Sequence, residues 1–454
     1  MAKFKFPGVY VEEKPRFQKM VKVPSVAVFI GYTEKHVNAN NDDIVYIPTI
    51  ITSLLEFEHF YGSAQSEQNI EMLDRSLQLA KKLNVYFKDV RSHHNLYYSV
   101  RLFFAQGGKS CTIVSVGNFK SLGEPLSASE LLSGLEILRT ETSNLLICIP
   151  ESQNMESQDF FVLQQALLKF CKEHSAFALL DLPKTTAQNL QNDISTYRTQ
   201  LQSESLSHGA AFFPNLLTVY SYFYDETTLT IKQRNRQFAL STIKDSEPAL
   251  YTKYKNALEQ FFVLLPPSPA AAGAFLRNDD LRGIWKVPAN IALNDVLRPE
   301  IAISEIDQDF LYFDNVSGKS INPIRVFSGK GTLIWGSRTL AGNDAEGKFI
   351  PVRRFINQVE KDLQNSMESL VFNENSPTVW ANIQQQTENY LMSHFSNGAF
   401  PGSTIREAFF VHCGLGATMT QNDIDKGVVI IEIGLAPVRP AEFIMLRIHH
   451  EIGK

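Results

Sequence analysis

Two of the Gly-Lys sequences in the chain are candidates for holding a phosphate group, because glycine frees backbone amides that a following lysine can supplement. They are Gly108-Lys109-Ser110 and Gly329-Lys330-Gly331. A phosphate-binding loop of this kind needs another glycine five residues before the Gly-Lys glycine, and Phe103 and Ile324 stand at those positions. The second sequence also lacks a Ser or Thr after its lysine. The spacing therefore argues against a nucleotide site.

Two histidine pairs, His93-His94 and His449-His450, could by residue type bind a metal or transfer protons. Adjacent residues on a strand point to opposite faces, so neither pair can chelate one ion. Exposed or capping histidines are the simpler interpretation. The sequence has no His-Glu-x-x-His, Cys-x-x-Cys or Gly-x-Ser-x-Gly motif. A catalytic triad assembled from distant residues stays open, because triads are recognised by geometry.

Asp181 ends an apolar stretch, which is where α/β enzymes hold catalytic carboxylates, although an aspartate that caps a loop is commoner there. The four cysteines are far apart, and three lie inside apolar stretches; they are Cys111, Cys148, Cys171 and Cys413. This pattern favours buried thiols in a reducing compartment over a disulfide framework or a zinc site. We therefore expect no catalytic residue, no cofactor and no metal.

The composition limits the partners of the chain. Its 454 residues, 44% of them hydrophobic, are enough for two or three domains with sizeable cores. A net charge of -5 provides no basic field for nucleic acid. The amino terminus has no apolar signal region, and no apolar run reaches 18 residues, so we expect no signal peptide and no membrane insertion.

The middle of the chain alternates between apolar runs and amphipathic stretches. The runs are 111–116, 145–149 and 177–180, and the stretches between them are 127–138 and 158–172. This pattern is typical of βαβ units and predicts an α/β fold with a mostly parallel sheet covered on both faces. Further helices are expected at 69–83 and 96–104, in the same layers.

The two ends differ from the middle. Residues 1–24 contain three prolines and one glycine around the strand-forming Val9-Tyr10-Val11. This composition predicts an extended arm. Near the other end, an apolar stripe predicts a helix over 351–371, and Ser376-Pro377 begins a second one. Two strands follow, 427–435 and 442–452. Both faces of the last strand are apolar, so it is either an internal strand of a terminal domain or a strand donated to a neighbouring copy.

Five segments resemble the motifs of one protein family and occur in the same order as in that family. They are Phe6 to Glu13, Phe103 to Gly108, Pro266 to Asn290, Ile321 to Arg325 with Trp335 to Leu340, and Gly434 to Phe443. In these residues the chain resembles the tail sheath family of contractile phages and related injection systems. Its length suits an extracellular system of the antifeeding-prophage type. The match is weakest over 32–95 and 185–255.

The resemblance implies an architecture. An N-terminal linking arm would occupy 1–24, an α/β sheath domain with subtilisin-like topology 25–345, and a smaller α+β C-terminal domain with a terminal linking strand 346–454. The resemblance also implies linking between subunits through both ends. The residues expected to link subunits are Phe6, Val9, Tyr10, Val11, Ile444, Leu446 and Ile448. Contact with an inner tube is expected at Gln384, Gln385 and Glu388.

The resemblance further implies a function without enzymatic activity. The chain would form stacked hexameric rings around an inner tube and contract to drive that tube through a target envelope. Its partners would be copies of itself, the tube protein, baseplate and terminal cap proteins, and sheath paralogues. It would assemble in the bacterial cytoplasm and then belong to a phage tail or a released particle. The alternatives are an α/β hydrolase-like enzyme and a cap or tube component of the same machine.

Overall fold

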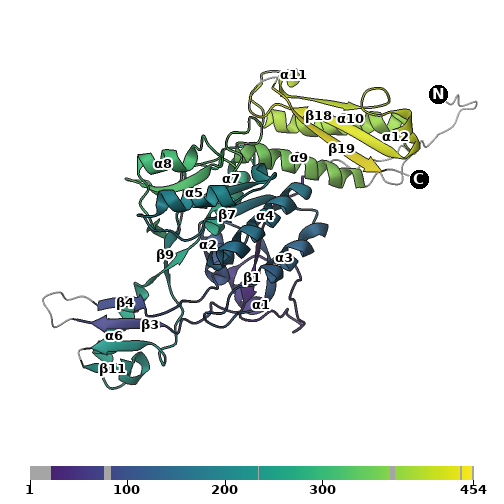
Figure 1. The fold of residues 1–454 in the computed structure, drawn as a ribbon. Helices are drawn as coiled ribbons and strands as arrows, with labels where there is room; N and C mark the ends of the chain where they lie inside the picture. The colour runs from purple at the N-terminus through teal and green to yellow at the C-terminus, as the bar shows by residue number, and fades with distance from the viewer. Residues whose placement is uncertain (1–21, 76–82, 234, 369–373, 440–441, 452–454) are drawn as a thin grey trace, which may run out of the picture. The chain divides into compact units, whose positions relative to one another are not determined.

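A computed structural model describes residues 22–75, 83–233, 235–368, 374–439 and 442–451. The chain forms two compact units, Val23–Lys361 and a smaller one that contains Asp362–Lys454. The boundary falls inside helix α9 (Ile350–Glu368), later than the position 345/346 expected from the sequence. Figure 1 labels the elements of both units.

The larger unit is built around a nine-stranded sheet in the order β13-β16-β15-β8-β7-β6-β1-β5-β2. Six neighbouring strands, from β15 to β5, are parallel, and the short strands β2, β16 and β13 add antiparallel edges. The strands are β1 Ser25–Thr33, β2 Thr49–Ile51, β5 Cys111–Asn118, β6 Asn144–Cys148, β7 Phe177–Asp181, β8 Gly209–Phe213, β13 Ile291–Ala292, β15 Ile321–Phe327 and β16 Gly331–Ile334.

Helices cover both faces of this sheet, because successive residues of a buried strand supply opposite faces. In β1, Ala27 and Phe29 belong to one hydrophobic core, and Val28 and Ile30 to the other. The first core also contains helices α1 (Leu54–Tyr61), α2 (Leu96–Ala105) and α7 (Ser268–Arg282). The second contains α3 (Ala128–Glu136), α4 (Ser157–Glu173), α5 (Leu190–Gln200) and α8 (Glu305–Tyr312). The predicted α/β fold with a largely parallel, doubly covered sheet is confirmed.

Two smaller sheets complete the larger unit. One has the order β11-β10-β3-β4, and Figure 1 shows it with helix α6 at one end of the unit. The other has the order β12-β9-β14. The elements are β3 Ile70–Asp74, β4 Leu83–Phe87, β9 Leu216–Ser221, β10 Thr230–Gln233, β11 Arg236–Ala239, β12 Phe262–Leu265, β14 Val296–Pro299 and α6 Pro248–Glu259.

The helix expected over 69–83 is wrong for the described residues of that segment. Residues 70–74 form β3, which pairs in parallel with β10 and antiparallel with β4. Ile70, Met72 and Asp74 are all buried in that sheet. The spacing of Ile70 and Leu73 also fits one side of a helix, but strand partners distant in the sequence determine the outcome.

The smaller unit contains a three-stranded antiparallel sheet in the order β17-β18-β19. Its strands are β17 Phe409–Cys413, β18 Val428–Leu435 and β19 Ile444–Glu451, and its helices are α10 Pro377–Ser396, α11 Ile405–Ala408 and α12 Gln421–Asp425. Buried residues of α10, β17 and β18, such as Trp380, Val411 and Ile431, form its core. The predicted helices and strands of this region are therefore present.

Candidate assembly surfaces

Asp181, the candidate catalytic carboxylate, caps a helix. Its Oδ1 accepts a hydrogen bond of 2.8 Å from the Ser268 backbone N–H, and its Oδ2 accepts one of 2.6 Å from the Ser268 hydroxyl. Helix α7 begins at Ser268. Burial raises the pKa of Asp181 to about 7. Because only 2% of its surface is exposed, the carboxyl group has no open side on which to meet a substrate. The capping interpretation is the one that the geometry supports.

His94 lies in the interior of the larger unit, contrary to the expected exposed position. Its Nδ1 is 3.3 Å from Glu151 Oε1, and its Nε2 accepts a 2.9 Å hydrogen bond from the Lys120 backbone N–H. Glu151 also accepts a bond from the Tyr32 backbone. Both ring nitrogens are therefore engaged, and the ring packs 4.9 Å from that of Phe119. This is a structural pair that ties three loops together.

The first Gly-Lys sequence is a tight turn between α2 and β5. A Cβ atom on Gly108 would lie 2.2 Å from the Phe103 ring, so glycine is required by packing. Lys109 is exposed and forms an ion pair with Asp280 at 2.8 Å. The false phosphate motif thus has a packing explanation. As expected, the cysteines are free thiols; Cys111, Cys148 and Cys171 are buried and Cys413 is partly buried.

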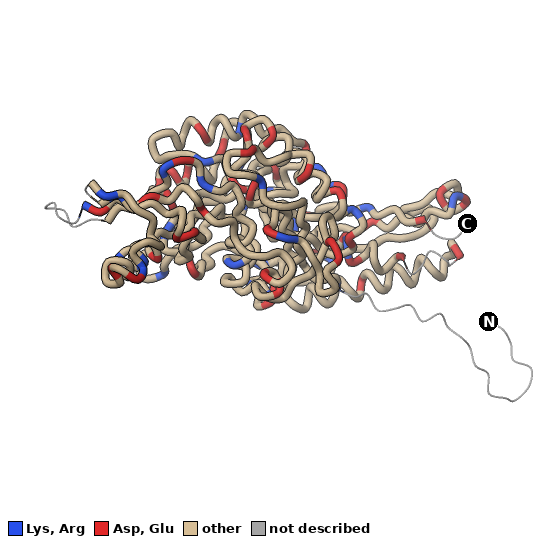
Figure 2. The backbone as a smooth tube through the Cα atoms, turned by 90° about the horizontal axis from the view of Figure 1, so that it is seen from below, with Lys and Arg blue, Asp and Glu red and all other residues tan. Residues whose placement is uncertain are grey.

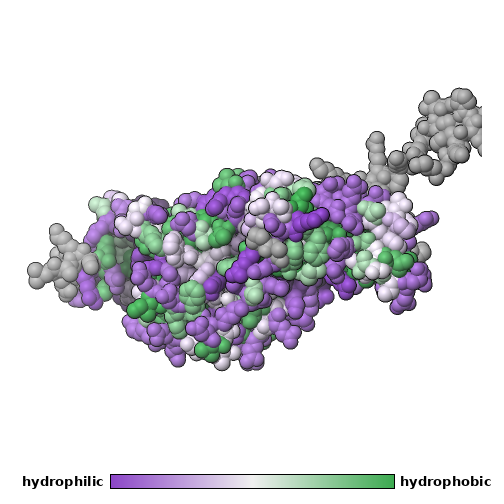
Figure 3. All heavy atoms as spheres, turned by 90° about the horizontal axis from the view of Figure 1, so that it is seen from above, coloured by the Kyte–Doolittle hydropathy of each residue, from purple (hydrophilic) through white to green (hydrophobic). Residues whose placement is uncertain are grey.

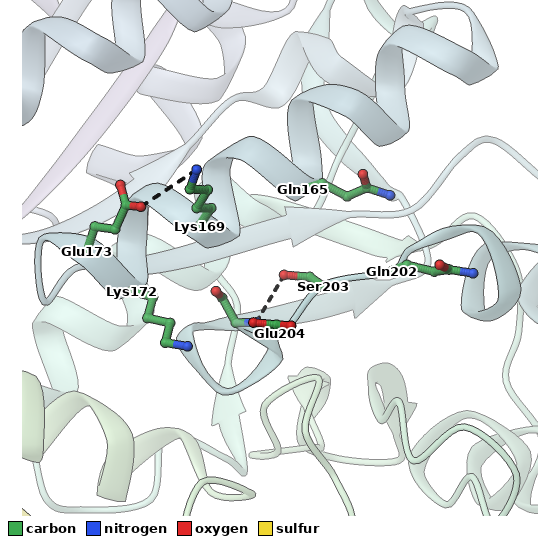
Figure 4. A pocket seen from close by; sticks show the side chains of 8 residues that line it. Gln165, Lys169, Lys172, Glu173, Gln202, Ser203 and Glu204 are labelled. Carbon is green, nitrogen blue, oxygen red and sulfur yellow. Dashed lines mark hydrogen bonds and ion pairs between the residues drawn. The ribbon is translucent and has the colours of Figure 1, made fainter.

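A surface hollow of about 850 Å³ lies beside α4 and the segment after α5. Figure 4 shows the Lys169–Glu173 ion pair on one side of it, with Lys172 pointing away from that pair. Its lining is Gln165, Lys169, Lys172, Glu173, Gln202, Ser203, Glu204 and Ser205. These are flexible side chains of mixed charge, mostly at the surface, and they do not form an organised binding site.

Within the described residues, no helix is long and apolar enough to cross a membrane. Figure 2 shows Lys and Arg interspersed with Asp and Glu along the backbone. In Figure 3 the hydrophobic residues visible on one face form separate small patches among hydrophilic ones. The candidate interaction surfaces are therefore small patches and strand edges.

Strand β19 is an edge of its sheet. It pairs in register with β18, so that Ile444, Leu446 and Ile448 face Leu435, Ile433 and Ile431. Leu446 and Ile448 are 9% and 5% exposed, whereas Met445 on the opposite face is 51% exposed. In this chain the last strand therefore belongs to its own terminal unit. Among the described residues β18 is its single strand neighbour, which leaves its other backbone edge unpaired there.

Helix α10 carries the residues expected to meet a tube. Gln385 is exposed, while Gln384 and Glu388 are half-buried and bonded to each other at 2.9 Å. The opposite side of the helix is buried through Trp380, Ile383, Thr387, Tyr390, Leu391 and His394. The other predicted linking residues, Phe6, Val9, Tyr10 and Val11, lie outside the described residues.

The β15–β16 hairpin carries a surface to which the sequence reasoning assigned no role. The Arg325 guanidinium lies 5.4 Å from the Phe327 ring centroid, and the Phe327 and Trp335 rings are 4.3 Å apart. Arg338 lies 4.6 Å from both the Tyr312 and Phe313 rings. The motif that contains Arg325, Trp335 and Arg338 was visible in the sequence. The hairpin register that stacks these side chains was not.

Residues 343–451 match the phage tail sheath C-terminal domain. The comparison with curated proteins gives no match. Among solved structures, the sheath of an extracellular contractile injection system, PVC, in the contracted state is 25% identical and aligns over 99% of this chain and 98% of its own, with a TM-score of 0.63.

A second solved structure, the baseplate of the anti-feeding prophage in the contracted state, contains a chain that is 27% identical over 98% of both chains, with a TM-score of 0.66. The sheath tail protein of Listeria innocua, at 8% identity, covers 95% of this chain and 96% of its own with a TM-score of 0.52, and shows the shared fold alone. These matched proteins are structural sheath or baseplate components. Together with the match at 343–451, they confirm the resemblance inferred from the sequence: the chain carries a match to the phage tail sheath C-terminal domain, and 98–99% of it aligns with chains from sheath and baseplate structures of contractile injection systems.

Proposed function

We propose that this sheath protein polymerises as stacked hexameric rings around an inner tube and contracts to drive the tube through a target envelope. The observation that carries the proposal is the backbone edge of β19, in a unit that matches the sheath C-terminal domain. An unpaired strand edge is a template for another strand. The protein would act without nucleotide or cofactor.

The two ends would link the copies. An arm of about 20 extended residues reaches on the order of 65 Å, which is far enough to leave its own domain and enter another. We propose that the arm around Phe6, Val9, Tyr10 and Val11 adds a strand to the terminal sheet of a neighbour. Ile444, Leu446 and Ile448 would anchor β19 by their buried side chains, while its backbone edge makes the link. These three side chains would therefore contribute to linking indirectly, because they hold β19 in its sheet.

The energy for contraction would come from the subunit interfaces. The extended sheath must then be higher in free energy than the contracted one and be held behind a barrier, which is kinetic stability. Backbone strand addition tolerates changes in the angle between domains better than side-chain packing does. The linking strands can therefore stay paired as hinges while other domain faces separate and repack.

The remaining partners follow from the same model. Gln384, Gln385 and Glu388 on α10 offer polar side chains that could contact the inner tube and release it on firing. Baseplate, terminal cap and paralogous sheath proteins would bind at the ends of the assembly or within it. The protein would assemble in the bacterial cytoplasm and then form part of a phage tail or a released particle.

The test compares two variants of the arm by negative-stain electron microscopy of the purified full chain. Replacing Val9, Tyr10 and Val11 by glycine keeps the length of the arm but removes its strand-forming residues. We expect a folded protein that forms no long tubes. The matched control, Val9→Ile with Val11→Ile, should form tubes like the wild type. Normal tubes from the glycine variant would contradict the proposal, and so would assembled sheath that contracts only when ATP is added.

A further inference from the structure

Two segments at opposite lateral edges of the nine-stranded sheet carry opposite net charge. At the β2 edge, residues 34–58 contain five acidic side chains and one lysine; the acidic residues are Glu34, Asp42, Asp43, Glu56 and Glu58. At the other edge, the hairpin segment 321–338 contains Arg325, Lys330 and Arg338 and no acidic residue, whereas helix α8 beside it carries Glu305, Asp307 and Asp309, so the basic charge is confined to the hairpin. We call these the acidic edge and the basic edge. Opposite potentials of this kind favour mutual docking.

Both edges also expose apolar side chains. At the acidic edge, Ile50 is 67% exposed and Leu55 75% exposed. At the basic edge, Val326 is 57% exposed and Trp335 37% exposed. Trp335 belongs to the stack with Phe327 and Arg325, and stacked tryptophan and arginine are the residue types that carry the most energy in protein interfaces. Each edge thus combines an apolar centre with charged surroundings.

The two edges cannot meet within one chain. In the strand order, β2 stands at one end and β16 is separated from the other end by β13 alone. With neighbouring strands about 4.8 Å apart, the edges are on the order of 30 Å from each other. Figure 1 shows α1 and α8, which flank the acidic and basic edges, well apart in this unit. Two copies are needed to bring the surfaces together.

The topology makes such a contact possible between copies in the same orientation. The loop that contains Asp42 follows β1, and the hairpin tip that contains Lys330 follows β15. Because β1 and β15 run in the same direction, both features lie at the carboxyl end of the sheet. A neighbouring copy displaced sideways therefore presents its acidic edge at the level of the basic edge. This is a head-to-tail contact, which repeats around a ring or along a helix.

The edge strands themselves are too short for strand addition. Strand β2 has three residues and β13 has two. Short edge strands are a common way to prevent pairing between sheets. Contacts at these edges must therefore be made mainly by side chains, unlike the contact at β19.

We propose that the basic edge of one copy, centred on Arg325, Lys330 and Trp335, docks on the acidic edge of the next copy, centred on Asp42, Ile50 and Leu55. The proposal rests on the proposed sheath function, because it requires many copies in one orientation. It identifies two domain faces that hold neighbouring copies together in addition to the terminal strands.

The first test is charge reversal in the full chain, with tube formation measured by sedimentation and electron microscopy. Lys330→Glu and Asp42→Lys should each raise the protein concentration needed for assembly about tenfold, and combining them should bring it back to within about threefold of the wild type. Lys244→Glu, at an exposed position in the segment that follows β11, is the matched control and should assemble normally. Circular dichroism melts check that each variant is folded.

Wild-type assembly by both single variants would overturn the proposal, and so would a folded double variant that does not recover.

The second test does not depend on tubes. Chains with Lys330→Cys and chains with Asp42→Cys, each also carrying Cys413→Ser, are mixed and oxidised. We expect a mixed disulfide dimer well above either homodimer. A mixed dimer that is absent, or no more abundant than the homodimers, would overturn the edge contact. Failure of the wild-type chain to form tubes would instead count against the proposed sheath function.

Discussion

The buried carboxyl of Asp181 predicts a specific dependence of stability on pH, which the variant Asp181→Asn can reveal. Asparagine has nearly the same shape. Its amide oxygen can accept the hydrogen bond from the Ser268 backbone, and its amide nitrogen can donate to the Ser268 hydroxyl. The variant therefore keeps the helix cap and removes the ionisation.

The magnitude follows from the raised pKa. Burial moves the pKa of Asp181 from 3.8 to about 7, a shift of about three units, and each unit corresponds to 1.36 kcal/mol. Because the folded protein binds this proton more tightly than the unfolded chain, the stabilisation is complete below pH 4 and is lost as the pH rises through 7. Relative to the Asn variant, the wild type should lose about 4 kcal/mol of unfolding free energy between pH 4 and 8.

The assay is urea unfolding over this pH range, followed by fluorescence of Trp285 and Trp335, which both lie in the larger unit. Asp280→Asn is the matched control, because Asp280 is an exposed aspartate whose side chain is 53% accessible. Its pH profile should parallel that of the wild type. If the profile of Asp181→Asn is also parallel to the wild type, Asp181 does not ionise as the geometry implies and the reasoning is refuted.

Three further predictions concern the larger unit. Arg354→Met should cost about 3–5 kcal/mol in urea unfolding because it breaks a buried ion pair with Asp279, and adding Asp279→Leu should restore most of that loss. Gly273→Ala should lower the unfolding free energy by about 1–3 kcal/mol, since its Cβ would lie 2.4 Å from the Phe103 carbonyl oxygen, with thermal melting as the measurement. Burial lowers the pKa of His208 to about 3, so its contribution to the free energy of unfolding is present above pH 6.5 and is lost on acidification. At pH 5 the wild type should therefore lose about 2 kcal/mol relative to His208→Gln, as measured by urea unfolding at pH 7 and 5.

The parts of the fold that follow from the sequence are those specified by local pattern. The run 111–116 is buried on both sides, so its continuous apolar composition identifies β5. The apolar stripe of 351–371 identifies α9, because one side of that helix packs on a core. In both cases a pattern within about 20 residues contains the whole physical cause.

The parts that could not be predicted depend on distant partners. The segment 69–83 was expected to be helical because its apolar spacing fits a helix, but β3 is determined by β10, far along the chain. The role of Asp181 likewise depends on Ser268, 87 residues later. The stack of Arg325, Phe327 and Trp335 requires the register of a hairpin. The sequence identifies single residues whose side chains could do chemistry. It does not identify the residues that lie next to them in the fold.

The proposed contacts between copies differ in the forces that hold them, and this difference bears on contraction. Strand addition at β19 uses backbone hydrogen bonds, which depend little on charge or salt. Docking of Lys330 near Asp42 uses exposed charges, which salt screens over about 10 Å at 0.1 M. High salt should therefore weaken the edge contact and spare the terminal links. A structure that must rearrange without falling apart needs such a division: faces that release, and strands that hold the copies together while the faces move.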